Sequence, residues 1–204
     1  MNLSSQDFSL HRDSLSSLFN RIDGRQLQNV FEEPWFNRLV PNAAKMLGCG
    51  QGSVVHLEGD VAVHTGAVFD AIGEVAVRRL GRGADFIEKL SAVLHDCRKP
   101  ATRVDNGDGS VSFPGHEALA ADEVPAIAKR LRMTTEEANR LEFIVRHHGD
   151  VHGWPDLAEE VKASLRSSPY FTSLALLQEA DALCCILPGG VHLAVYWDDM
   201  VLGK

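Results

Sequence analysis

The chain has 204 residues, 45% of them hydrophobic, and a formal net charge of −8, which predicts one globular domain, alone or with a helical extension. The negative charge excludes non-specific attraction to nucleic acid as its main mode of binding, and the sequence contains no DNA-binding motif. Its four cysteines form no C-x-x-C pair, which favours reduced thiols. The chain begins with no signal-peptide pattern and contains no uncharged apolar run of about 18 residues, so we expect a cytoplasmic protein without a membrane partner.

Apolar residues recur at three- and four-residue spacing along most of the chain, which predicts helices. In the first half we expect them over residues 8–20, 35–47, 61–80 and 84–97. The glycine-rich segment 48–53 interrupts this pattern, so we place a border there, between an N-terminal helical extension (1–50) and a main domain (51–204).

The second half continues the helical pattern after one exception. Residues 101–115 combine β-prone pieces with an Asn-Gly-Asp-Gly turn, which predicts a short hairpin or an extended loop. Helices are expected again over 116–131, 134–148, 157–166 and 170–187, with Gly149 as a stop signal. The predicted fold class is therefore all-α.

Histidines and carboxylates are placed on these predicted helices in a way that favours a metal site. A lone histidine on a helix is usually structural, but several of these residues adjoin apolar runs, where an unpaired charge is costly. Imidazole and carboxylate donors suit Mn, Fe, Ni, Co or Zn, and a bound ion lowers the pKa of water. The candidate ligands are His64, His95, Asp96, His116, His147, His148 and Asp181.

The order of these residues resembles the HD-domain metal phosphohydrolase superfamily. More narrowly, residues 54–149 resemble the HD domain of bacterial CCA-adding and poly(A) polymerase-type tRNA nucleotidyltransferases. The matching phrases are HLEGDV with the following HT, LHDCRKP, FPGHE, KRLR and VRHH. The polymerase head of those enzymes has no counterpart in residues 1–50, so we expect a stand-alone HD-type helical bundle that does not add nucleotides.

The resemblance implies roles for particular residues. It implies one divalent ion held by His64, His95, Asp96 and Asp181. It implies a second ion held by His116, His147 and His148 beside a bridging Asp96. Asp96 and Lys99 would be the catalytic residues, with Lys99 contacting a substrate phosphate. Arg98 stands where the family has glycine, so we expect it at the rim of the site as a second cation. Whether one or two ions bind, and whether they are Mn, Fe, Ni, Co or Mg, is left open.

Weaker signals surround this set. His152 follows the His147-His148 pair on a loop and is a further candidate for binding substrate. His56, Glu58 and Asp60 are expected to brace the start of the helix that carries His64.

The function that this pattern favours is metal-dependent hydrolysis of phosphomonoesters or phosphodiesters. The expected substrate is a phosphorylated small molecule, a nucleotide or an RNA end, with 2′,3′-cyclic phosphates among the candidates. Two alternatives stay open: a di-iron oxygenase with the same ligands, and a non-catalytic module that binds RNA or a protein. The oligomeric state is also open, a homo-oligomer included.

Overall fold

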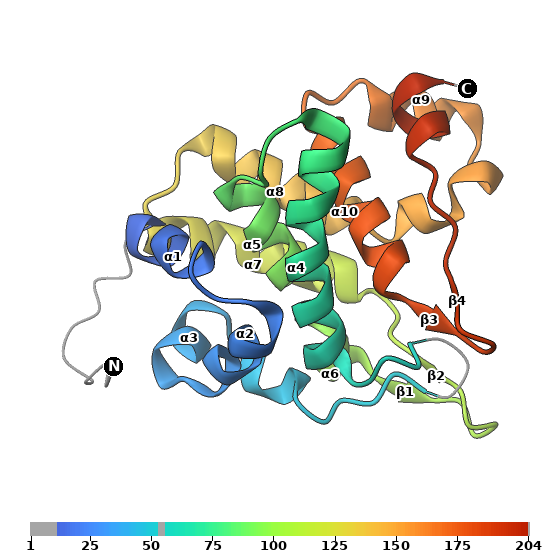
Figure 1. The fold of residues 1–204 in the computed structure, drawn as a ribbon. Coiled ribbons are helices and arrows are strands. Elements are labelled where there is room, and N and C mark those ends of the chain that lie inside the picture. Colours follow the sequence, from blue (N-terminus) through green and yellow to red (C-terminus); the bar gives the residue numbers. More distant parts are fainter. Residues whose placement is uncertain (1–11, 53–55, 204) are drawn as a thin grey trace.

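The computed structural model describes residues 12–52 and 56–203, and most of them lie in helices (Figure 1). This confirms the all-α fold class. The helices before the middle of the chain are α1 (Arg12–Phe19), α2 (Gly24–Glu32), α3 (Pro34–Leu39), the 3-10 helix η1 (Ala43–Met46), α4 (Val61–Leu80), α5 (Phe86–Leu94) and α6 (Lys99–Thr102). Those that follow are α7 (His116–Leu131), α8 (Thr135–His147), the 3-10 helix η2 (Asp150–Asp156), α9 (Glu159–Arg166), α10 (Phe171–Cys184) and the π-helical turn η3 (Asp198–Leu202). Two antiparallel hairpins pair β1 (Val104–Asp105) with β2 (Val111–Ser112) and β3 (Ile186–Leu187) with β4 (Val191–His192).

The N-terminal helices differ from their prediction. Sequence spacing missed α2, which begins with a capping box between Asp23 and Gln26. The helix expected over 35–47 is divided into α3 and η1, because Pro41 cannot donate a helical hydrogen bond and Asn42 has a left-handed backbone (φ 68°).

Three later boundaries also differ. The helix expected over 84–97 ends at Leu94, and Pro100 lies in the first turn of α6, where proline is tolerated. The helix expected over 170–187 ends at Cys184 and leads into the hairpin β3–β4, which was not predicted. The helix expected over 134–148 does end near Gly149, at His147, but Gly149 has a right-handed helical backbone and leads into η2. Residues 101–115, predicted as a short hairpin or an extended loop, contain the hairpin β1–β2.

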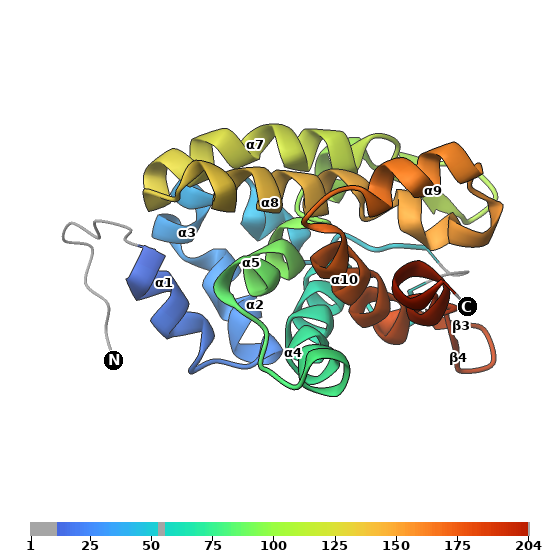
Figure 2. The same cartoon turned by 90° about the horizontal axis from the view of Figure 1, so that it is seen from above.

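The arrangement brings several helix ends to one place. α7 and α8 run side by side along one face of the molecule, while α4, α5 and α10 pack beneath them (Figure 2). Neighbouring helices that are joined by a short loop are antiparallel, so the start of α7 meets the end of α8 and the start of α4 meets the end of α5. Among the described residues, no helix combines the length and the apolar character that crossing a membrane requires.

The N-terminal helices pack on the helix that carries His64. Apolar residues of α1, α2 and α3 share one core with those of α4 and α5. The contact between α2 and α4 is very close at a pair of glycines: a Cβ added to Gly24 would lie 2.0 Å from the carbonyl oxygen of Gly66. The backbone amide of Gly24 also donates a hydrogen bond to Asp70 in α4 (2.8 Å). Residues 12–47 thus buttress α4, while the border at residue 50 stays a prediction.

We expect Gly24→Ala to destabilise the protein. A methyl group at this position collides with backbone that cannot move independently, and overpacking of this kind costs about 1–3 kcal/mol. The matched control is Gly73→Ala in α4, where a Cβ would meet no atom within 4 Å. That change should stabilise the protein by about 0.5–1 kcal/mol because alanine favours a helix. Urea unfolding measures both, and equal stabilities for the two variants would contradict the close contact.

Candidate metal centre

The helix ends that meet inside the molecule carry a cluster of histidines and carboxylates. The side chains come from α4, from the turn after α5, from the start of α7, from the end of α8 and from α10, and all are at most 8% exposed. They are His64, His95, Asp96, His116, His148 and Asp181. Residues separated by more than a hundred positions in the sequence are thus in direct contact.

The first group of possible metal ligands is His64, His95 and Asp181, whose donor atoms all lie within 4.8 Å of one another. The Nε2 atom of His64 lies 2.9 Å from Oδ1 of Asp181. Oδ2 of Asp96 faces the same group, at 3.3 Å from Nε2 of His95 and 3.8 Å from Nε2 of His64. One cation placed among these atoms would therefore have two imidazole nitrogens and two carboxylates around it.

The second group consists of Asp96, His116 and His148. Here the other oxygen of Asp96 is the one in contact: Oδ1 lies 3.2 Å from Nε2 of His116 and 3.6 Å from Nε2 of His148. Each oxygen of Asp96 thus faces a different group of histidines. A carboxylate that bridges two metal ions would need this arrangement, with one oxygen directed to each ion.

Backbone carbonyl groups orient three of the histidine rings. The Nδ1 atoms of His95, His116 and His148 lie 2.7–2.8 Å from the carbonyl oxygen three residues earlier in each case. A neutral ring that donates from Nδ1 carries its lone pair on Nε2, the atom that faces Asp96. This is the arrangement in which histidines bind metals.

Several polar atoms of the cluster have no conventional hydrogen-bond partner. Both nitrogens of His64, Nε2 of His95, Nε2 of His116 and both oxygens of Asp96 are buried without a hydrogen bond of good geometry. Buried polar groups of this kind are costly unless something satisfies them. Their donor types and their convergence on two points fit one or two divalent cations.

Lys99 extends from α6 into the cluster. Its Nζ lies 2.7 Å from Oδ2 of Asp96 and donates to the amide oxygen of Gln51 at 2.8 Å. It also lies over the ring of Phe113, 5.3 Å from the centroid. Burial disfavours its charge, but Asp96 raises the pKa of Lys99, so the group is a cation at neutral pH.

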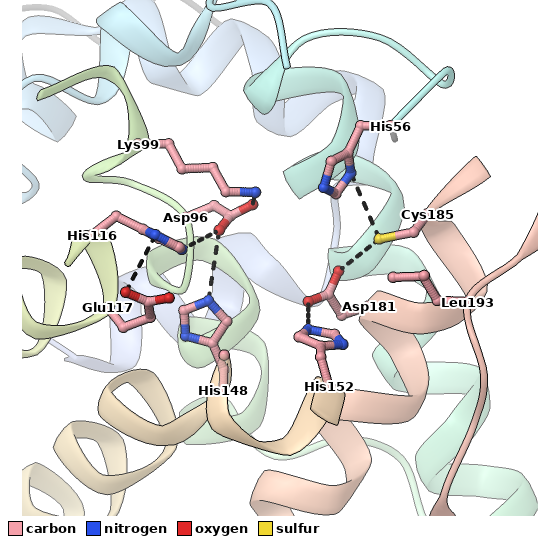
Figure 3. A pocket seen from close by; sticks show the side chains of 11 residues that line it. His56, Asp96, Lys99, His116, Glu117, His148, His152, Asp181, Cys185 and Leu193 are labelled. Atoms are coloured by element: carbon pink, nitrogen blue, oxygen red, sulfur yellow. Dashed lines mark hydrogen bonds and ion pairs between the residues drawn. The ribbon is translucent and has the colours of Figure 1, made fainter. Parts of the chain in front are cut away.

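A cavity of about 230 Å³ opens on these residues (Figure 3). Asp96, Lys99, His116 and His148 lie along one side of it, and Asp181 with His152 lies opposite. Pockets that enclose drug-sized ligands usually have volumes of about 300–1,000 Å³. This smaller cavity can therefore enclose a phosphate group and the atoms bonded to it more readily than a whole nucleotide.

Three residues that sequence reasoning assigned to the site have different surroundings. His152 does line the cavity, and its Nε2 lies 2.8 Å from Oδ2 of Asp181. Arg98 instead pairs with Glu123 and is absent from the described lining. His147 is turned away, with Nδ1 2.8 Å from Asp150, because consecutive residues of a helix point about 100° apart. We therefore omit His147 from the proposed ligands and Arg98 from the rim.

Comparison with known proteins finds distant similarity to tRNA-processing enzymes. No protein-family model matches the chain. A multifunctional CCA protein of Ralstonia nicotianae is 29% identical over 115 residues, which cover 56% of this chain and 24% of that protein. An A-adding tRNA nucleotidyltransferase of Deinococcus radiodurans is 28% identical over 139 residues, or 67% of this chain and 30% of that protein. A multifunctional CCA protein of Paracidovorax citrulli is 24% identical over 151 residues, which cover 71% of this chain and 34% of that protein.

The similarity is thus partial. This chain resembles these tRNA nucleotidyltransferases, as its motifs indicate, but it spans only about a quarter to a third of their length. The similarity supports a nucleotide- or RNA-related enzyme and leaves the reaction to be proposed from the site.

Sequence reasoning missed several residues that surround the cluster. Gln51 holds Lys99, while Glu117, Cys185 and Leu193 line the cavity. Cys185 carried a usable signal, since it follows Asp181 by four residues and such pairs share a face of a helix. Gln51 carried none, because only folding brings its loop to Lys99. Glu58, which was expected to brace α4, lies with Oε1 2.8 Å from Nδ1 of His64, and Asp60 caps α4 by accepting from the amide of Val63 (2.9 Å).

We expect the metal-free protein to lose stability as the pH rises from about 6.5 to about 9. Burial alone would lower the pKa of His64, but the carboxylates of Asp181 and Glu58, 2.9 Å and 2.8 Å from its two ring nitrogens, outweigh burial and raise the pKa to about 9. A group whose pKa is higher in the folded state stabilises the protein fully when the pH is below the pKa of the unfolded state. This stabilisation is lost as the pH rises through the pKa of the folded state. The effect is on the order of 3 kcal/mol. Thermal unfolding in EDTA across this range measures it, and a pH profile of His64→Gln as steep as that of the wild type would contradict it.

Proposed function

We propose that this protein is a metal-dependent phosphohydrolase of the HD type that acts on a terminal or cyclic phosphate of a nucleotide or an RNA end. The observation that supports this most strongly is the convergence of buried, unpartnered donor atoms on the two sides of Asp96. The distant similarity to tRNA nucleotidyltransferases supports nucleotides or RNA ends as the substrate class.

The proposed ligands of one ion are His64, His95, Asp96 and Asp181, and those of a second ion are His116, His148 and Asp96. A bound divalent cation would act as a Lewis acid on the phosphoryl group and lower the pKa of water near neutrality. Four of these ligands line the cavity directly: Asp96, His116, His148 and Asp181.

The cavity residues have separate roles toward the substrate. Lys99 presents a buried ammonium to a phosphate oxygen, and Gln51 together with Phe113 holds that ammonium in place. A charge-assisted contact of this kind is stronger where water is excluded. His152, hydrogen-bonded to Asp181 at the opposite wall, is placed to contact the substrate beyond the phosphate.

The proposal is tested by metal analysis of the purified protein together with hydrolysis assays. Phosphomonoesters, 2′-nucleotides, 2′,3′-cyclic nucleotides and RNA with a cyclic phosphate end should be assayed with Mn, Ni, Mg and Co. We expect release of phosphate or opening of the cyclic ester with at least one metal, and none after chelation. If the wild type is no more active than Asp96→Asn on any of these substrates, the phosphohydrolase proposal is contradicted. The alternative of a non-catalytic binding module would then be favoured. Bound iron with O₂ uptake would indicate the oxygenase instead.

We expect His116→Ala to reduce bound metal from two ions per chain to one. Nε2 of His116 faces Oδ1 of Asp96, the oxygen on the side of the second group, so its loss removes a ligand of that group and leaves the first group complete. Loss of the second ion should lower activity by about 100-fold, since a metal contributes several kcal/mol to a phosphoryl displacement. Unchanged metal content and rate would mean that the centre is mononuclear. His192→Ala, on the exposed strand β4, is the matched control.

A further inference from the structure

A second cluster of metal-binding side chains lies against His64. It consists of His56, Glu58, His64 and Cys185, whose donor atoms all lie within 4.8 Å of one another. Oε1 of Glu58 is 2.7 Å from Nδ1 of His56 and 2.8 Å from Nδ1 of His64. The sulfur of Cys185 is 3.6 Å from Nδ1 of His56, and Figure 3 shows it between His56 and Asp181.

An unpartnered atom is directed into this cluster. His64 is fully buried and neither of its ring nitrogens has a hydrogen bond of good geometry. Its Nε2 faces Asp181 and the centre described above, while its Nδ1 faces Glu58 and the second cluster. The same ring thus stands between two groups of possible ligands.

The donor set of the second cluster differs chemically from that of the first. Cysteine sulfur is a soft ligand, and a thiolate together with imidazoles and a carboxylate suits Zn²⁺ rather than Mg²⁺ or Mn²⁺. The proposed phosphohydrolase ligands contain no sulfur. A thiophilic ion would therefore prefer the second cluster, which contains a cysteine, to the phosphohydrolase centre, which does not.

We propose that His56, Glu58, His64 and Cys185 form an inhibitory site for Zn²⁺ that shares His64 with the phosphohydrolase centre. Binding replaces the proton of the Cys185 thiol and the Nδ1 proton of His64 with zinc, and both protons are released to solvent. His56 and His64 bind as neutral rings through Nδ1, and Glu58 binds as a carboxylate. The inhibitory effect rests on the proposed function, whereas zinc binding itself does not.

His64 explains how zinc would inhibit. A neutral imidazole has one lone pair, so a ring that binds zinc through Nδ1 carries its proton on Nε2. That proton is then donated to Oδ1 of Asp181, which lies 2.9 Å away. His64 and Asp181 are both lost as ligands of the phosphohydrolase centre, so the two sites cannot be filled together.

The surroundings of Cys185 favour a cation. Its side chain is 1% exposed, and Oδ1 of Asp181 lies 3.4 Å from the sulfur. Burial and the nearby carboxylates raise the pKa of the Cys185 thiol, so without a metal it is a neutral and unreactive group. A bound zinc ion would place positive charge between the carboxylates of Glu58 and Asp181. Without zinc, a proton supplies this charge.

Cobalt titration of the metal-free full-length protein tests the site without reference to activity. Co²⁺ bound to a thiolate gives a sulfur-to-metal charge-transfer absorption that nitrogen and oxygen ligands do not give. We expect this absorption in the wild type, in Asp96→Asn and in the matched control Cys184→Ser, and its absence in Cys185→Ser. Added Zn²⁺ should remove it. No absorption in the wild type, or an equal absorption in Cys185→Ser, would overturn the site.

The inhibition is measured separately, with Zn²⁺ added to the Mn²⁺-dependent reaction and each variant normalised to its own zinc-free rate. The inhibition constant should rise at least about tenfold in Cys185→Ser and stay unchanged in Cys184→Ser, because even loss of an outer partner of a metal ligand costs about 10- to 100-fold in affinity. Equal inhibition of the two variants would overturn the coupling through His64. Circular dichroism of both variants verifies folding. If no hydrolysis is found at all, the cobalt absorption still decides the site.

Discussion

Asp96→Asn is expected to abolish metal binding at the phosphohydrolase centre, and hydrolysis with it, while preserving the helical fold. The carboxylate of Asp96 contacts histidines of both groups, through a different oxygen in each case. The amide nitrogen of asparagine is a donor and cannot replace a carboxylate oxygen as a ligand. Loss of several kcal/mol of transition-state stabilisation corresponds to about a thousandfold or more in rate.

The measurement combines metal content, turnover at saturating metal and circular dichroism. Asp108→Asn is the matched control, since Asp108 is an exposed carboxylate in the β1–β2 turn whose partner is Ser110. Wild-type turnover by Asp96→Asn at saturating metal would end the metallohydrolase proposal. Loss of helical signal in this variant would instead call for Asp96→Glu, which keeps the charge and should retain metal with reduced turnover.

Lys99→Met is expected to lower catalytic efficiency by about 10- to 150-fold while leaving bound metal unchanged. The Lys99 ammonium lines the cavity and is not a metal ligand, so its loss removes a phosphate contact worth about 1.5–3 kcal/mol. Methionine keeps the length and the apolar part of the side chain and removes the ammonium that lies over the ring of Phe113.

Arg98→Gln is the matched control for this prediction. Arg98 adjoins Lys99 in sequence but pairs with Glu123 outside the described cavity lining, so we expect less than about a threefold change, as for other partly exposed ion pairs. Similar losses in the two variants would return Arg98 to the site. Normal efficiency in Lys99→Met would leave phosphate recognition to other residues of the cavity, such as His152.

Much of the candidate site was accessible from sequence because its residues stand at the ends of apolar helical runs. His95 and Asp96 follow such a run, and Asp181 interrupts another. Burying an unpaired charge is costly, so the sequence predicts that these side chains are buried next to a group that pairs with them. Helix boundaries were less predictable. Pro41 and Asn42 divide a helix that its apolar spacing alone makes continuous, and β3–β4 consists of two residue pairs with no periodic signal.

The sequence by itself determined the helical class and the set of side chains from which a metal centre can be built. Only the tertiary structure decided which of them meet. His148 faces Asp96 and its neighbour His147 does not, because the rotation of α8 against α7 selects one of two adjacent residues. In the same way Lys99 points into the cavity, while Arg98 pairs with Glu123 of α7. The position of Cys185 beside His56 depends on packing between segments that are 129 residues apart, and no local pattern reports such a contact.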